Sequence, residues 1–195
     1  MKNNEENWDL PENPPNDFDF VEAYDDEPLT DEQMLEENTA PSAINCAFVG
    51  VGGGGGKLAK AFLDLGFNKT LLVNTTEKDQ PAGVNPENFI LIPGADGVGK
   101  DVKLGKEILS NNSALIEDTL RTRVGKVDWI FVLAGAGGGT GSASFVLHKA
   151  ISRYMSSIGS SGKVIYIVST PSAQELLNPT IKSNCEMMLQ DIKKE

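Results

Sequence analysis

Short apolar runs alternate with amphipathic stretches along the chain from about residue 43 onward. Continuous runs of Val, Ile, Leu and Phe, bounded by turn residues, are typical of buried strands. They predict five strands, at residues 43–49, 70–73, 89–92, 128–133 and 163–169. Stretches with helical spacing predict helices at residues 57–65, 100–110, 114–123 and 180–193, and one more that follows the second glycine run and continues through Met155.

This order of elements predicts the fold class. Strands that are apolar along their whole length and alternate with helices indicate a parallel sheet with helices on both faces. We therefore expect an α/β fold, a Rossmann-like three-layer arrangement. Ligands of such sheets bind at the carboxyl ends of the strands. Two glycine-rich segments, residues 50–56 and 134–142, follow the first and fourth predicted strands and fall at this edge.

The charge is unevenly distributed along the chain. Residues 1–42 hold 14 acidic residues and one base, a net charge of −13, with five prolines and no glycine. Residues 43–195 hold 14 acids and 16 bases, a net charge of +2. We therefore predict a disordered acidic tail at 1–42 and a folded domain at 43–195. The tail is either a solubilising arm or a linear motif that docks on an unidentified partner or on the domain's own basic face.

Composition excludes several classes of protein. No apolar run approaches the roughly 20 residues that span a bilayer, and residues 1–9 carry neither the basic nor the apolar part of a secretory signal. The two cysteines, Cys46 and Cys185, cannot form a disulfide framework, and we expect Cys46 to pack in a buried strand and Cys185, in the last helix, to be chemically inert. These features predict a cytoplasmic protein with no membrane span. We also expect no nucleic-acid partner, although the acidic tail dominates the net charge and that charge does not by itself exclude one. The single histidine, His148, has no partners in the sequence that suggest catalysis, so we expect a structural or surface role.

The first glycine run is Gly-Val-Gly-Gly-Gly-Gly-Gly at 50–56, followed by Lys57. Glycines let backbone N–H groups approach an anion closely, and the helix N-terminus behind them adds a partial positive charge, which favours phosphate. A Walker A loop does not fit, because Val51 stands where its first glycine should be and Leu58 replaces the Ser/Thr that binds Mg²⁺. The dinucleotide pattern Gly50-x-Gly52-x-x-Gly55 is present, but five consecutive glycines satisfy it easily.

Two further interpretations of the first glycine run stay open, a dinucleotide site and a plain strand–helix turn. A dinucleotide site needs an acid at the end of the second strand, and this chain has Asn74-Thr75-Thr76 there. A plain strand–helix turn needs only one or two glycines.

The second glycine run, residues 134–142, provides a second anion cradle, and two cradles on one sheet suit a triphosphate held from both sides.

The sequence Gly137-Gly-Gly-Thr140-Gly-Ser142 resembles the signature loop of the tubulin/FtsZ family of GTPases. Other segments follow in that family's order: residues 50–56 resemble its first nucleotide loop, Asn74-Thr75-Thr76 its second, residues 94–100 its third, which senses the terminal phosphate, and residues 171–175 its fifth. The resemblance covers residues 43–195 and implies the nucleotide-binding domain of a tubulin/FtsZ-type protein.

This resemblance implies a site for GTP or GDP with Mg²⁺, in which Glu175 takes the ribose. It assigns no catalytic and no metal-ligating residue in this chain. The cofactor-binding residues that it implies lie in the loops just named: Gly52, Gly53, Gly54, Gly55, Asn74, Gly97, Gly99, Gly137, Gly138, Gly139, Thr140, Gly141, Ser142 and Glu175. Four positions depart from the family pattern. Lys57, after the first loop, stands where other residues are usual. Ala143 replaces a glycine, Thr76 replaces an acid that helps to arrange Mg²⁺, and Pro179 replaces an arginine near the guanine.

The family's second domain, and the acidic pair that activates water on the next subunit's nucleotide, have no counterpart before Glu195. We therefore expect a guanine-nucleotide-binding protein that takes part in filament assembly. It would associate with copies of itself or with a complementary tubulin-like chain, and hydrolyse GTP only when another subunit or domain completes it. The alternatives are a nucleotide-independent structural module that keeps the fold, and a fragment of an NAD(P)-binding oxidoreductase.

Overall fold

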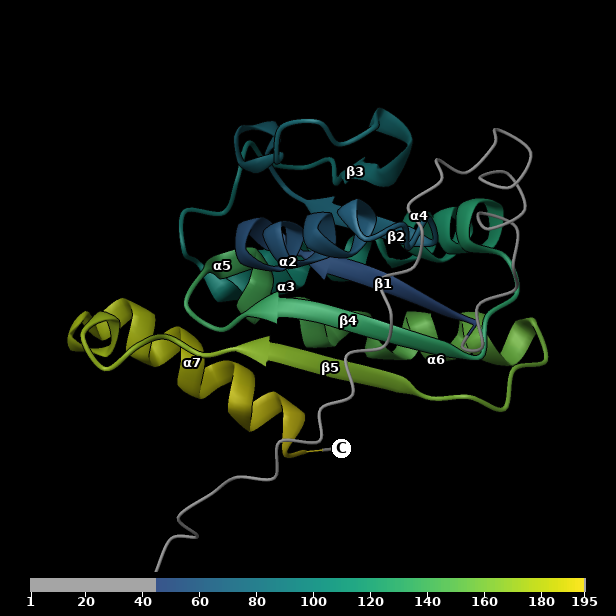
Figure 1. The fold of residues 1–195 in the computed structure, drawn as a ribbon. Coiled ribbons are helices and arrows are strands. Elements are labelled where there is room, and N and C mark those ends of the chain that lie inside the picture. Colours follow the sequence, from purple (N-terminus) through teal and green to yellow (C-terminus); the bar gives the residue numbers. More distant parts are fainter. Residues whose placement is uncertain (1–44, 195) are drawn as a thin grey trace, which may run out of the picture. The chain divides into compact units, whose positions relative to one another are not determined.

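The computed structural model describes residues 45–194, and within them five parallel strands form one sheet in the order β3-β2-β1-β4-β5 (Figure 1). The predicted α/β fold with a parallel sheet is confirmed. The predicted acidic tail at 1–42 lies outside the described residues and stays a prediction. The strands are β1 (Cys46–Val51), β2 (Thr70–Asn74), β3 (Phe89–Leu91), β4 (Trp129–Gly135) and β5 (Val164–Ser169).

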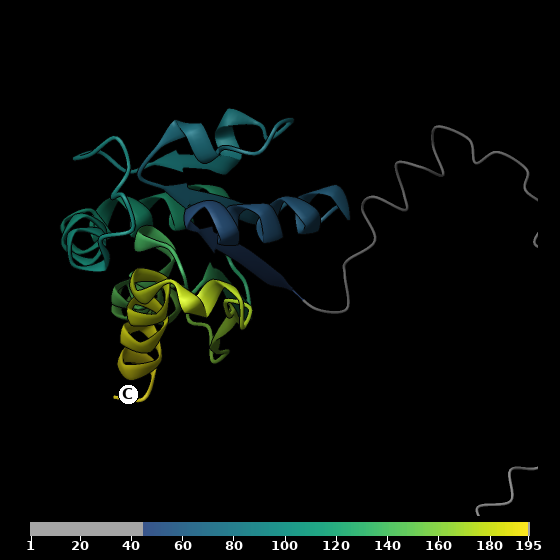
Figure 2. The ribbon, with the colours of Figure 1, turned by 90° about the vertical axis from the view of Figure 1, so that its left-hand side faces the viewer.

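Helices cover both faces of the sheet, as the sequence predicts (Figures 1 and 2). Helix α2 packs on one face, and α3, α4 and α6 pack on the other. Because every strand runs in the same direction, all the strand–helix turns on the carboxyl side meet at one edge. The helices are α2 (Gly52–Asp64), α3 (Val102–Asn111), α4 (Ser113–Thr119), α5 (Gly139–Ser142), α6 (His148–Ser157) and α7 (Pro179–Ile192).

Alternate residues of the strands supply the cores on the two faces of the sheet, and a third, smaller cluster joins the ends of β4 and β5 to α7. In β1, Ala47, Val49 and Val51 face α3, α4 and α6, where the larger core lies. Phe48 faces α2 and stacks on Phe62 with ring centroids 3.8 Å apart. Strand β1 is buried on both faces along its whole length, so the first glycine run begins from a fixed point.

The start of α2 differs from the prediction. The sequence predicts a glycine loop over 50–56 and a helix from Lys57, but Gly50 and Val51 belong to β1 and α2 begins at Gly52. Glycine is a poor helix former, so propensity alone predicts a loop. Packing overrides that preference. A Cβ on Gly55 would lie 2.1 Å from the carbonyl oxygen of Leu133 in β4, which means that α2 and β4 approach with backbone almost touching backbone.

The helix predicted to follow the second glycine run is also divided. Helix α5 ends at Ser142, a 3-10 turn at Ser144–Leu147 follows, and α6 begins at His148. The helix predicted at 114–123 ends in a π-helical turn at Leu120–Val124. Short 3-10 turns at Glu77–Asp79, Pro86–Asn88 and Glu175–Leu177 complete the described elements.

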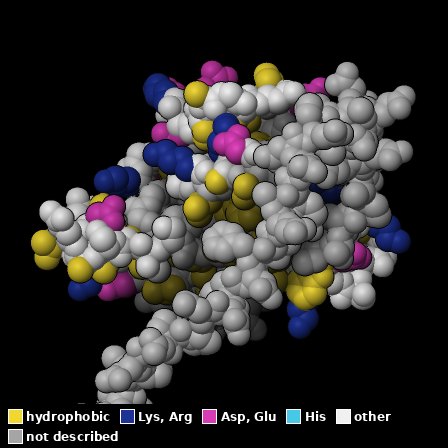
Figure 3. Space-filling view, in the orientation of Figure 1, with side chains coloured by type: hydrophobic (Ala, Val, Ile, Leu, Met, Phe, Trp, Pro, Cys, Tyr) yellow, Lys and Arg dark blue, Asp and Glu magenta, His cyan; other side chains and the backbone are white. Residues whose placement is uncertain are grey.

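The described surface is mixed in charge. On the face shown in Figure 3, lysine and arginine side chains are interspersed with aspartate and glutamate and form no continuous patch. None of the helices described in residues 45–194 has the length and apolar character needed to cross a bilayer.

Candidate functional site

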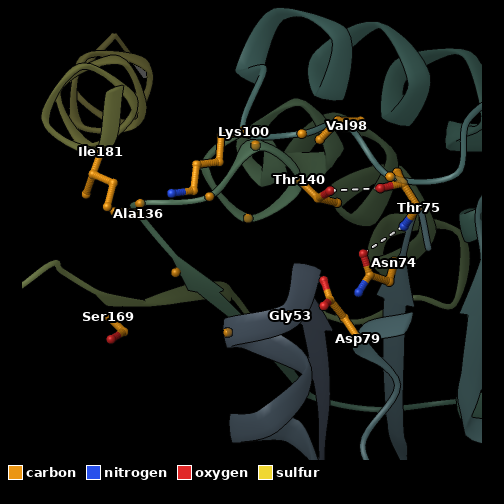
Figure 4. Close-up of a pocket in the computed structure, with 18 of the residues that line it drawn as sticks. Gly53, Asn74, Thr75, Asp79, Val98, Lys100, Ala136, Thr140, Ser169 and Ile181 are labelled. Atoms are coloured by element: carbon orange, nitrogen blue, oxygen red, sulfur yellow. Dashed lines mark hydrogen bonds between the residues drawn. The ribbon is translucent and has the colours of Figure 1, made fainter. Parts of the chain in front are cut away.

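A cavity of about 560 Å³ opens at the carboxyl ends of the strands (Figure 4). Its walls come from the β1–α2 turn, the end of β2, the loop before α3, the loop after β4, and the segment between β5 and α7. These are five separate parts of the sequence. Their convergence at one place follows from the parallel sheet, which brings all of its carboxyl-side connections to the same edge.

Eleven of the fourteen site residues implied by the sequence line this cavity. The structure therefore brings together all five segments in which the sequence places a site. The eleven residues are Gly53, Gly54, Asn74, Gly97, Gly99, Gly137, Gly138, Gly139, Thr140, Gly141 and Glu175.

The other three, Gly52, Gly55 and Ser142, lie behind the lining. Gly52 has a φ of +72°, and a Cβ there would be 2.7 Å from the backbone nitrogen of Gly141, so this glycine lets the two glycine segments meet. Ser142 is fully buried, and its hydroxyl has no hydrogen-bond partner among the described residues. These residues shape the walls of the cavity without facing it.

Backbone N–H groups give the cavity its electrostatic character. Helix α2 begins without a capping side chain and has no acidic residue in its first turn, so its first N–H groups lack intrahelical partners. Gly53 and Gly54, in that turn, line the cavity. The segment 137–141 contributes further backbone with no side-chain cap. Uncapped N–H groups and the positive end of a helix dipole favour a bound anion.

Two threonines that line the cavity, Thr75 and Thr140, are hydrogen-bonded to each other. The hydroxyl oxygens of Thr75 and Thr140 are 2.9 Å apart, and Thr75 is fully buried while Thr140 is 7% exposed. The backbone N–H of Thr75 donates to the side-chain oxygen of Asn74 over 2.8 Å. These bonds fix the end of β2 against the second glycine segment, as Figure 4 shows.

The loop before α3 is tied to the end of β2. The N–H of Gly97 donates to the carbonyl of Thr75 over 2.8 Å. Asp96 accepts from the ammonium of Lys78 at 2.7 Å and from the hydroxyl of Thr76 at 2.9 Å. The bond from Lys78 is the larger cause that lowers the pKa of Asp96, the bond from Thr76 adds to it, and the same pair raises the pKa of Lys78. Thr76, which stands where the family that the sequence resembles has an acid, is therefore hydrogen-bonded to Asp96.

A residue that the sequence analysis missed connects two walls of the cavity. The side-chain amide of Asn184, in α7, donates to the carbonyl oxygens of Lys100 at 2.9 Å and Gly137 at 3.3 Å. Asn184 is only 3% exposed. The available signal was an asparagine among the apolar positions of an amphipathic helix, because a buried amide needs partners.

Two carboxylates and one ammonium group belong to the lining. The carboxylate of Glu175 accepts from the backbone N–H and the hydroxyl of Ser172, both at 2.8 Å, and these bonds lower the pKa of Glu175. Asp79 and Lys100 line the cavity but were not among the predicted site residues. Asp79 faces the first turn of α2, since a Cβ on Gly53 would lie 3.0 Å from its carboxylate oxygen.

Within residues 45–194, no group of three or more His, Cys, Asp and Glu side chains is arranged to hold a metal ion. His148 lies outside the cavity lining and stacks on Phe145, with ring centroids 5.3 Å apart. Cys46 and Cys185 are buried free thiols. These placements agree with the structural roles expected for all three residues.

Comparison with known proteins shows that this chain is similar to tubulin-like proteins. The tubulin-like protein CetZ2 of Haloferax volcanii is 37% identical over 122 residues, which cover 55% of this chain and 33% of the relative. A structure of CetZ from Methanosaeta thermophila superposes with a TM-score of 0.67 at 25% identity, covering 77% of this chain and 43% of the other. The chain contains a tubulin/FtsZ-family domain.

A third comparison concerns an assembled relative of this tubulin/FtsZ-family domain. The structure of CetZ2 from Haloferax volcanii as a GTPγS-bound protofilament superposes with a TM-score of 0.66 at 28% identity, covering 78% of this chain and 47% of that one. The chain thus spans a third of the length of the curated relative and less than half of these solved chains. No protein-family profile matches the chain.

Proposed function

We propose that this tubulin/FtsZ-family domain binds GTP and GDP in the cavity at the carboxyl edge of the sheet. The observation that carries the proposal is the convergence of two glycine segments with unpaired backbone N–H groups on one cavity of about 560 Å³. A volume of this size is usual for cofactor pockets. The related CetZ2 protofilament is described as GTPγS-bound, which supports a guanine nucleotide as the ligand.

The proposed roles of the residues follow from their chemistry. Gly53, Gly54 and the segment 137–141 surround the phosphates with backbone N–H donors. Glu175, whose lowered pKa keeps it ionised, accepts hydrogen bonds from ribose hydroxyls. Asn74 and the two joined threonines hold the wall between these groups. Gly52, Gly55 and Ser142 act indirectly, since they set how closely the walls approach.

The residues also fit a magnesium ion carried with the nucleotide. Mg²⁺ in nucleotide sites keeps several waters and is bound through substrate phosphates and one or two carboxylates, so it needs no cluster of protein ligands. Asp79 is the lining carboxylate beside the first turn of α2 and is our candidate. The ion would neutralise phosphate charge that Asp79 otherwise repels. The hydroxyl of Thr76 donates to Asp96, so we assign the contact with Mg²⁺ to Asp79 and not to Thr76.

We further propose that the protein takes part in filament assembly in the cytoplasm and that it hydrolyses GTP only when another subunit or domain completes the site. The protofilament of the related CetZ2 supports the proposed filament assembly. The second part rests on the described lining of the cavity, whose acidic side chains are Asp79 and Glu175 and which does not include His148. Phosphoryl transfer needs a positioned water and a charge clamp, which an added subunit would supply.

Calorimetric titration of the full chain tests nucleotide binding. We expect heat with GTPγS and GDP in Mg²⁺ buffer and none with ATP or NAD. Heat with NAD alone would assign a dinucleotide site, and silence with all four would refute nucleotide binding. Sedimentation of the chain with and without GTPγS then tests assembly. If the protein stays in the supernatant in both conditions, filament formation by this chain alone is contradicted.

A matched pair of variants places the ligand. Gly54→Ala adds one methyl to the cavity lining, where its Cβ would lie 3.6 Å from Gly135, so it adds no clash. Gly56→Ala adds the same methyl two residues later, 3.6 Å from Leu72 and outside the lining. We expect Gly54→Ala to lose about tenfold in affinity, which corresponds to about 1.4 kcal/mol, and Gly56→Ala to bind like the parent protein. Equal affinities would place the nucleotide elsewhere.

A further inference from the structure

A second cavity, of about 330 Å³, lies where α3, the segment 145–149 that leads into α6, and the C-terminal end of α7 meet. Three of its described lining residues are lysines, Lys106, Lys149 and Lys194, and we call it the lysine cavity. It shares no lining residue with the proposed nucleotide site. Whatever it binds is therefore bound separately from the nucleotide.

The lysine cavity concentrates positive charge. Its lining holds three lysines and one acid, Asp191, so its formal net charge is three minus one, or +2, with His148 neutral. Residues 43–195 together also carry a net charge of only +2. Elsewhere in this part of the chain positive and negative charges balance, and the excess lies at this one cavity. A cleft lined by one sign of charge focuses its field and attracts ions of the opposite sign.

Asp191 leaves most of this charge unpaired. One of its carboxylate oxygens lies 2.5 Å from the Nζ of Lys106, in an ion pair that joins α7 to α3, with the two side chains 20% and 30% exposed. The Nζ of Lys194 is 3.9 Å from the other oxygen, at the outer limit of an ion pair. Within residues 45–194, Lys149 belongs to no ion pair. One ammonium group of the lining is thus free and a second is loosely paired.

Stacked rings form another wall of the lysine cavity. Phe145 and His148 both line it, with ring centroids 5.3 Å apart and an angle of 9° between the ring planes. The Nε2 of His148 is 3.5 Å from the hydroxyl oxygen of Ser152, one turn further along α6. A rigid apolar surface beside a few charged groups is the usual composition of a small-molecule site.

We propose that the lysine cavity is a second ligand site, for a small phosphate compound that carries two or more negative charges. The phosphate would lie among the three ammonium groups and compete with Asp191 for Lys106. A phosphate monoester carries about −1.5 to −2 at pH 7 in one group, which matches the +2 of the lining, whereas a carboxylate supplies a single charge. A volume of about 330 Å³ is at the lower end of the usual range for small-molecule sites, which favours a compact ligand over an extended chain.

The single histidine of the chain is a local reporter for this site. The ring signals of His148 are followed by NMR in the full chain, at fixed pH and ionic strength, as inorganic pyrophosphate is added. Acetate is the control anion with one charge. We expect saturable shifts with pyrophosphate and none with acetate at the same concentration. Pyrophosphate in the nucleotide cavity would not produce this pattern, because His148 lies outside that lining.

Two variants should change the affinity in opposite directions. Lys149→Met keeps the stem and removes the free charge, and it should bind pyrophosphate about fivefold more weakly. Asp191→Asn removes the carboxylate that competes for Lys106, and it should bind about fivefold more tightly. The matched controls are Lys103→Met in α3 and Glu186→Gln in α7, which make the same changes of charge at exposed positions outside the lining. Both controls should bind like the parent protein.

These measurements can overturn the proposal at each step. His148 signals that stay in place, or that move in proportion to pyrophosphate without saturating, remove the site. Equal losses in Lys149→Met and Lys103→Met would mean that overall charge, and not this cavity, attracts the anion. A phosphoserine peptide that binds more tightly than pyrophosphate would overturn the small-molecule ligand. Urea unfolding checks the fold of Asp191→Asn, and if that variant is unfolded, the comparison of the two lysine variants decides alone.

Discussion

Two adjacent glycines in α2 should respond in opposite ways to the same added methyl group. Gly55 and Gly56 both lie inside the helix, where alanine is favoured over glycine by about 1 kcal/mol. At Gly56 the new Cβ would sit 3.6 Å from the side chain of Leu72, an ordinary contact. At Gly55 it would sit 2.1 Å from the carbonyl oxygen of Leu133, which no rotamer change can move.

The magnitudes follow from these two contacts. Gly56→Ala should stabilise the fold by about 1 kcal/mol through helix propensity. Gly55→Ala forces α2 and β4 apart by more than an ångström, and overpacking of this kind costs about 3 kcal/mol. The higher helix propensity of alanine offsets about 1 kcal/mol of that cost. We therefore expect a net loss of about 2 kcal/mol for Gly55→Ala. The two variants should differ by about 3 kcal/mol.

Urea unfolding of the full chain, followed by far-ultraviolet circular dichroism without nucleotide, measures the difference. The unfolding midpoints should fall on opposite sides of the parent value, with unchanged slopes. Two variants of equal stability, or a Gly56→Ala variant less stable than Gly55→Ala, would show that α2 does not pack on β4 as described. Gly56→Ala must also keep its nucleotide affinity, because it lies outside the cavity lining.

Three further perturbations test other parts of the site. Asp79→Asn should shrink the ratio of GTPγS affinities measured in Mg²⁺ and in EDTA, and an unchanged ratio would remove Asp79 from the metal site. Asn184→Ala removes the buried amide that donates to two partly buried carbonyl groups and should lower the free energy of unfolding by about 1 kcal/mol, so an unchanged urea midpoint contradicts the bridging role. Lys78→Met should raise the pKa of Asp96 toward its ordinary value, as measured by NMR titration of the carboxyl carbon. In the parent protein, the contact between Asp96 and Lys78 stabilises the fold at pH values above the ordinary aspartate pKa, and this stabilisation is lost as the pH falls through the lowered pKa of Asp96. If Lys78→Met leaves the pKa of Asp96 unchanged, the pairing is refuted.

The strands were the most predictable part of the fold. Runs at 70–73 and 128–133 lie within one or two residues of β2 and β4, because strands buried on both faces must be apolar along their length. The start of α2 was not predictable from propensity. Gly52 through Gly56 are poor helix formers, and only the close approach of α2 to β4 explains their helical conformation.

The site was predictable where it depends on local sequence and not where it depends on distant contacts. The two glycine segments identify themselves, because backbone N–H groups that contact phosphate require glycine next to a helix start. Asp79, Lys100 and Asn184 gave no comparable signal. Each is a common residue type whose importance comes from neighbours that lie far away in the sequence, such as Gly137 for Asn184.

The contact between Gly55 and the carbonyl oxygen of Leu133 limits how this chain can change over generations. When two side chains collide, a smaller residue at the second position can act as a suppressor mutation. Here the second atom is part of the main chain, and every amino acid carries it. No substitution at Leu133 can therefore rescue a larger residue at Gly55, and a genetic screen for revertants should recover changes back to glycine at position 55 and no suppressor at position 133.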